Sequence, residues 1–164
     1  PRADCCGSVF TPSTEAMTHR SPAIDDLVRR LLHHEAGGAP DVEQLAVAVE
    51  GTCQKLSGEL ATLVGRGGAA ALLGRAVNLA KREFPLLGGV RPQADAPFAL
   101  GGLRESLQGC RPAEAEAASA AVLANLLGLL VDLLGEDLGL RPVGKIWPGL
   151  LPGPASRTFR ETEA

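Results

Sequence analysis

The feature that most constrains the fold is a nearly unbroken apolar stretch from Ala117 to Leu134. Only three of its residues are polar, namely Ser119, Asn125 and Asp132. Alanine and leucine, two of the best helix formers, supply most of the others. A helix that is apolar on almost every side is either buried in a core or crosses a membrane. The Asn125 amide and the Asp132 carboxylate would be costly to place inside a bilayer. We therefore predict that this stretch is a central core helix.

The composition favours helices throughout the chain. Leucine accounts for 26 of the 164 residues and isoleucine for two, and tyrosine is absent. Strands prefer β-branched and aromatic side chains, whereas leucine loses little rotamer freedom in a helix. A chain of this length is sufficient for one hydrophobic core. We predict an all-α, single-domain helical bundle of about five to six helices.

Apolar residues at steps of three and four mark the other helices. The first helix begins with Ser21 as its N-cap and Pro22 at its first helical position, where a proline fits. The second begins at Asp41, which has capping-box spacing to Gln44. The predicted helices cover residues 22–36, 41–64, 69–84, 98–108 and 138–147, the last bent or broken by Pro142, with a loop over 86–97.

The chain divides into three parts. We predict that residues 1–20 form a disordered or non-native N-terminal segment and that residues 21–147 form the bundle. The C-terminal tail, 148–164, has three prolines, two glycines and scattered charge, a composition that gives little apolar surface to pack. We expect this tail to be disordered.

Charge and cysteine content exclude several functions. A net charge of −3 and five aromatic residues argue against a nucleic-acid binder, which needs a basic surface. The four cysteines form no CxxC pair, and His33 and His34 are adjacent, so their side chains diverge on a helix. We expect no metal, no cofactor, no disulfide framework and a reducing, cytoplasmic location. No catalytic residue is predicted.

The turn Gly65-Arg66-Gly67-Gly68 is the most distinctive local motif. Glycines allow successive backbone N–H groups to converge at a helix start beside an arginine, which are the components of an anion site. The candidate ligand-binding residues are Arg66, Gly67, Gly68 and Asp132. A plain interhelical turn explains the glycines equally well, and Asp132 could instead form a salt bridge to Arg66, Arg75 or Arg141.

These observations favour a non-enzymatic regulatory or protein-interaction module, of a bacterial style in its Ala, Gly, Leu and Arg content. It would bind a protein partner or its own copy through a leucine-rich face, with no role for nucleic acid or membrane. The alternative is a small-molecule or anion-binding domain that uses the Gly65–Gly68 turn. A second alternative is an enzyme that uses the carboxylates Asp132, Glu136 and Asp137.

Overall fold

The computed structural model describes residues 21–38, 40–93 and 99–151, which form one bundle of helices. In chain order the elements are α1 (Pro22–Ala36), α2 (Val42–Glu83), the 3₁₀ helix η3 (Pro85–Gly89), β1 (Arg91–Pro92), β2 (Leu100–Gly101), α3 (Leu103–Leu107), α4 (Pro112–Leu134), α5 (Glu136–Gly139) and α6 (Arg141–Ile146). Helices dominate the described residues, and the strands form one two-residue pair. The predicted all-α class is confirmed.

The helix ends follow the local chemistry of the sequence. The Ser21 side chain accepts a hydrogen bond from the backbone N–H of Ile24, and Gly37 closes α1 in a left-handed conformation. At the start of α2, Asp41 and Gln44 form both hydrogen bonds of a capping box. These caps satisfy backbone groups that the first and last helical turns leave unpaired. The starts predicted for both helices are confirmed.

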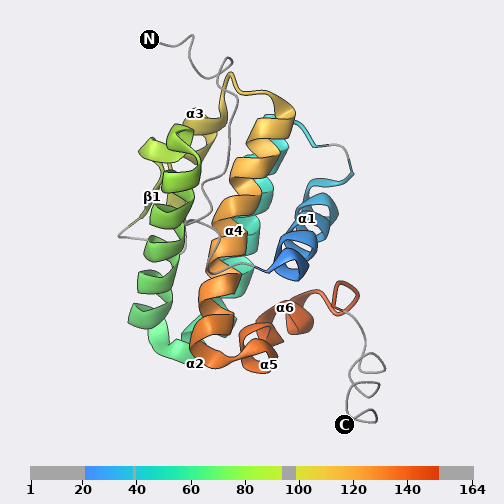
Figure 1. Cartoon of the computed structure of the whole chain (residues 1–164), viewed down its shortest axis with the longest axis vertical. Coiled ribbons are helices and arrows are strands. Elements are labelled where there is room, and N and C mark those ends of the chain that lie inside the picture. The colour runs from blue at the N-terminus through green and yellow to red at the C-terminus, as the bar shows by residue number, and fades with distance from the viewer. Residues whose placement is uncertain (1–20, 39, 94–98, 152–164) are drawn as a thin grey trace.

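α2 consists of two arms joined by a sharp kink. Only Gly65 leaves the helical conformation, with φ 78° and ψ 163°. The arms, residues 42–64 and 66–83, run in opposite directions past α4, one behind it and one beside it (Figure 1). A positive φ is accessible to glycine without strain. The predicted break is therefore present, but Arg66, Gly67 and Gly68 already belong to the second arm.

α4 is the central helix that its composition predicts. It lies between α1 and the two arms of α2 (Figure 1), and every residue from Ala121 to Leu130 is buried. In the last turn that follows, Asp132 and Leu133 are exposed. Its buried Asn125 donates a hydrogen bond from Nδ2 to Oε1 of the buried Glu83, at 3.3 Å. By length and composition α4 could also cross a membrane, but the core helix of a soluble protein passes the same test, and 67% of its most apolar window is buried.

The segment between α2 and α4 differs from the prediction. In place of a loop and a helix over 98–108, the described residues form η3, the β1–β2 pair and a shorter helix, α3. Gly102 explains the late start, because it has φ 82° and a Cβ there would lie 2.4 Å from the carbonyl oxygen of Gly89. That close backbone approach holds β2 beside η3 and excludes a helix until Leu103.

The end of the bundle also continues further than expected. The last helix is split at Leu140, and Pro142 lies in the first turn of α6, where a proline fits. Beyond Trp147 the chain turns, and the partly buried Leu150 and Leu151 pack against the core. Two residues of the predicted tail, Leu150 and Leu151, thus pack against the bundle. Residues 152–164 and the predicted segment 1–20 lie outside the described residues.

Gly139 allows α5 to pack directly on the backbone of α4. A Cβ at this position would lie 2.9 Å from the carbonyl carbon of Leu130 and from two backbone atoms of Val131. We expect Gly139→Ala to lower the free energy of unfolding by about 1–3 kcal/mol, because the backbones must separate. Urea denaturation followed by circular dichroism measures the change.

The matched control is Gly51→Ala in α2, where a Cβ meets nothing within 4 Å. It should stabilise the protein by up to about 1 kcal/mol, the helix-propensity difference between glycine and alanine. Equal effects of the two substitutions would show that the α5 contact is looser than described.

Candidate functional site

The predicted anion site is a simple helix start. Arg66, Gly67 and Gly68 form the exposed first residues of the second arm of α2, directly after the kink at Gly65. Their backbone N–H groups belong to a helix N-terminus, which favours negative charge. Among the ion pairs between described residues, none involves Arg66.

Asp132 lies in the exposed last turn of α4, at the same end of the molecule as the kink (Figure 1). Among the ion pairs of the described residues, none joins it to Arg66, Arg75 or Arg141. Glu136 and Asp137 follow it in the first turn of α5, also exposed. The predicted ligand residues therefore share one end of the bundle, and a binding role for them stays a prediction.

His33 and Cys53 are held by contacts within the fold. His33 contacts the carbonyl oxygen of Gly38 at 2.6 Å and Oε1 of Glu116 at 3.0 Å, and these two hydrogen bonds raise its pKa. Burial, with a smaller effect of Glu50, raises the pKa of Cys53 to about 12, so its thiol is protonated at neutral pH. In the described part of the chain, no three His, Cys, Asp or Glu residues are arranged to hold a metal ion.

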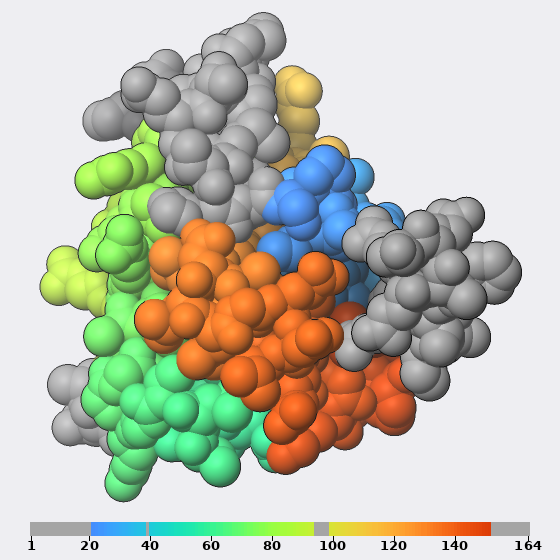
Figure 2. Space-filling view, turned by 60° about the horizontal axis from the view of Figure 1, so that its bottom comes forward, coloured from blue at the N-terminus to red at the C-terminus, as the bar shows by residue number. Residues whose placement is uncertain are grey.

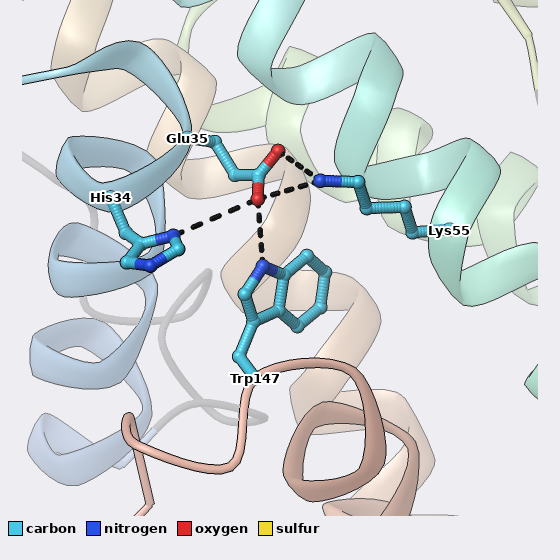
Figure 3. Close-up of polar contacts among 4 residues, drawn as sticks. All are labelled: His34, Glu35, Lys55 and Trp147. Carbon is cyan, nitrogen blue, oxygen red and sulfur yellow. Dashed lines mark hydrogen bonds and ion pairs between the residues drawn. The ribbon is translucent and has the colours of Figure 1, made fainter.

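Three residues from separate elements meet where α1 ends, and we call this group the clasp: Glu35, Lys55 and Trp147. Figure 3 shows them together with the neighbouring His34. Trp147 Nε1 donates to Glu35 Oε1 at 2.7 Å, and Lys55 Nζ lies 2.6 and 2.8 Å from the two carboxylate oxygens. Lys55 Nζ also lies 5.6 Å from the centre of the indole ring, within range of a cation–π contact. The clasp thus joins α1, α2 and the end of α6.

The clasp was not predicted from the sequence. Lys55 lies 20 positions and Trp147 lies 112 positions from Glu35 in the chain, and no local pattern connects the three residues. The only available signal is chemical: a buried tryptophan needs a partner for its N–H. The Glu35 carboxylate accepts hydrogen bonds from both other members, and His34 Nδ1 lies 3.8 Å from its Oε1. These contacts connect parts of the fold to one another, and we assign the clasp a structural role.

The charge of Glu35 should make the clasp sensitive to acid. Burial raises the pKa of this carboxyl, but hydrogen bonds from Lys55 and Trp147 outweigh burial and hold the pKa below its ordinary 4.5. A lowered pKa stabilises the fold above about pH 4.5 and loses that effect as the pH falls through the folded-state value. We expect Glu35→Gln to cost about 1–2 kcal/mol at neutral pH and less in acid.

Fluorescence of Trp147, the only tryptophan in the chain, reports urea unfolding of both proteins across this pH range. Glu105→Gln, at an exposed position on α3, is the control and should track the parent. A cost of Glu35→Gln that stays constant down to the acid limit would contradict a role for the carboxylate charge.

An exposed apolar corner lies where α4 turns into α5. The structure describes every leucine of the chain, and only Leu133 and Leu138 are exposed, at 61% and 39%. They flank Gly135 and have the partly buried Val131 and Leu134 as neighbours in the chain. We call Leu133 and Leu138 the α4–α5 corner. In Figure 2 the end of α4 and α5 face the viewer between the α2 kink and α6.

Comparison with known proteins adds no relative. No family model matches this chain, and no curated protein or solved structure is significantly similar to it. Its own features are the α2 kink, the clasp and the α4–α5 corner. Of these three, the corner is the one that leaves apolar surface exposed to solvent.

Proposed function

We propose that the protein is a non-enzymatic helical module that binds another protein through the α4–α5 corner. The observation that carries this proposal is the exposure of Leu133 and Leu138, because the other 24 leucines of the chain are buried or half-buried. Single exposed apolar side chains are common, but two leucines on consecutive helices can bury surface together. Apolar surface of this kind marks protein-interaction sites.

The packing of α5 supports a preformed surface. Gly139 brings the backbone of α5 against Leu130 and Val131 of α4, and the Gly135 N–H is hydrogen-bonded to the carbonyl oxygen of Val131 at 2.8 Å. The two leucines are therefore held by a short, packed connection. A surface ordered before binding loses less conformational entropy when a partner arrives.

Photo-crosslinking tests the proposal. A benzoylphenylalanine at position 133, in the cells that produce the protein, should give a discrete adduct with another protein. Excess wild-type protein should compete for that adduct, and the double variant Leu133→Ser/Leu138→Ser should not. Because both side chains are exposed, the double variant should keep the stability of the parent within about 1 kcal/mol.

The control position is Val47, which is also exposed, at 49%, but lies on the first arm of α2. Adducts that form equally from both positions, or that the serine variant competes away as well as the parent does, would contradict binding through the corner. An adduct of twice the chain's own mass would indicate self-association.

A further inference from the structure

We infer that the second arm of α2 presents a basic stripe, Arg75, Asn78 and Arg82, that binds an acidic segment of another protein. The three side chains follow one another at steps of three and four residues, so they share one face of the helix, and all three are exposed. In Figure 1 this arm forms one outer side of the bundle, with α4 between it and α1. The stripe belongs to another element than the α4–α5 corner, and the inference therefore goes beyond the proposed function.

The charges of the chain are unevenly distributed around the basic stripe. Residues 65–93, all of which the structure describes, carry five bases and one acid, Glu83, which is buried. The other 135 residues carry 11 bases and 18 acids. One of the five bases is the exposed Arg91 of β1, a strand that contacts α2. A local excess of positive charge thus lies in a protein whose net charge is −3.

The arginines of the basic stripe have no acid within reach along the helix. Ion pairs on a helix form between residues three or four positions apart, and the residues at these distances from Arg75 and Arg82 are all uncharged. Among the ion pairs between described residues, none involves either arginine. Bases on other elements each pair with an acid, namely Arg30, Lys55, Arg104 and Lys145. The described part of the fold therefore leaves the charge of the stripe available to a partner.

The helix dipole accounts for only part of this charge. Lys81 and Arg82 lie in the last turn of α2, where a base is favourable because it is close to the negative end of the dipole. That effect is confined to the last turn. Arg75 lies about two turns before the helix ends, and Arg91 lies outside the helix. These two arginines add positive charge that the stability of α2 does not require.

The chemistry of the stripe favours carboxylates over a membrane or a nucleic acid. An arginine guanidinium binds a carboxylate through two parallel hydrogen bonds. Helices that lie on a membrane insert exposed apolar side chains, but the exposed large apolar residues of the described chain are Val47, Leu133 and Leu138, on other parts of the fold. Single-stranded nucleic acids stack on exposed aromatic rings, and Phe84, the one aromatic residue of 65–93, is buried. An acidic protein segment requires neither feature.

Fluorescence anisotropy at low salt tests the inference with the full-length protein and a labelled oligoglutamate peptide as the probe. Arg75→Gln/Arg82→Gln should weaken binding about three- to tenfold, the combined strength of two exposed charge pairs. The matched control is Arg29→Gln/Arg141→Gln, which removes the same charge from two exposed bases of α1 and α6. The control should bind the peptide like the parent, and circular dichroism should show the parent's helix content in both double variants.

Equal losses of affinity in the two double variants would mean that only the net charge matters, and this result would overturn the inference. The absence of binding to oligoglutamate would overturn it as well. Duplex DNA and vesicles that mix phosphatidylserine with phosphatidylcholine are the competing anions. Tighter binding to either of them that depends on Arg75 and Arg82 would assign the stripe to that other class of partner. Leu133→Ser/Leu138→Ser should bind oligoglutamate like the parent, which separates this test from the test of the proposed function.

Discussion

Replacing Trp147 with alanine is expected to lower the free energy of unfolding by about 3–5 kcal/mol, the range for a buried tryptophan. Its side chain is only 4% exposed and packs where α6 meets α1 and α2. The change also removes the indole N–H that donates to Glu35 at 2.7 Å, which leaves that carboxylate with Lys55. Urea denaturation followed by circular dichroism measures the loss, since the variant has no tryptophan fluorescence.

Trp147→Phe separates packing from hydrogen bonding in the clasp. Phenylalanine fills most of the indole volume but has no N–H, so it should cost about 1.5–3 kcal/mol, the value of a hydrogen bond to a charged group. If Trp147→Ala and Trp147→Phe both leave the free energy of unfolding unchanged, the contact between the end of α6 and α1 does not stabilise the fold.

Leu126→Ala and Leu130→Ala are each expected to cost about 2–5 kcal/mol, because both side chains are buried in the core and their removal leaves a cavity. A domain of this size has a total stability of about 5–15 kcal/mol, so either variant would be marginal. The measurement is chemical denaturation in detergent-free buffer.

The matched control lies on the same helix. Leu133→Ala deletes the same atoms one turn beyond Leu130, at a position that is 61% exposed, and should change the stability by no more than about 0.5 kcal/mol. If the two buried-leucine variants unfold like the parent, α4 is peripheral. A parent protein that stays in solution only with detergent would instead favour a membrane helix.

The helices and their ends could be predicted because their causes are local. Ser21, Asp41 and Gln44 act on backbone groups within three residues of themselves, so a short window of sequence contains the whole interaction. The break at Gly65 is also local, since its positive φ interrupts α2 regardless of what the two arms pack against. The length of α3 was overestimated. Its late start depends on the close approach of Gly102 to Gly89, two residues 13 positions apart in the chain, and a local window of sequence does not contain such a contact.

The candidate binding surface was predictable only in part. Asp132 attracted attention as an acid in an apolar helix, and the structure places it beside the exposed Leu133. In the sequence, however, Leu130 and Leu133 cannot be told apart, because both are leucines of one apolar run. One is fully buried and the other is 61% exposed, because the neighbouring elements cover α4 up to Leu130 and leave part of its last turn open.

The helical class, the central place of α4 and most helix ends follow from the sequence, since composition, periodicity and capping act over a few residues. Which distant side chains meet, and which leucines stay exposed, depends on how the helices pack in three dimensions. Glu35 and Trp147 are 112 positions apart, and their contact depends on how α1, α2 and α6 pack. The exposure of Leu133 and Leu138 has the same origin, because burial is a property of the neighbours that the fold supplies and not of the residue itself.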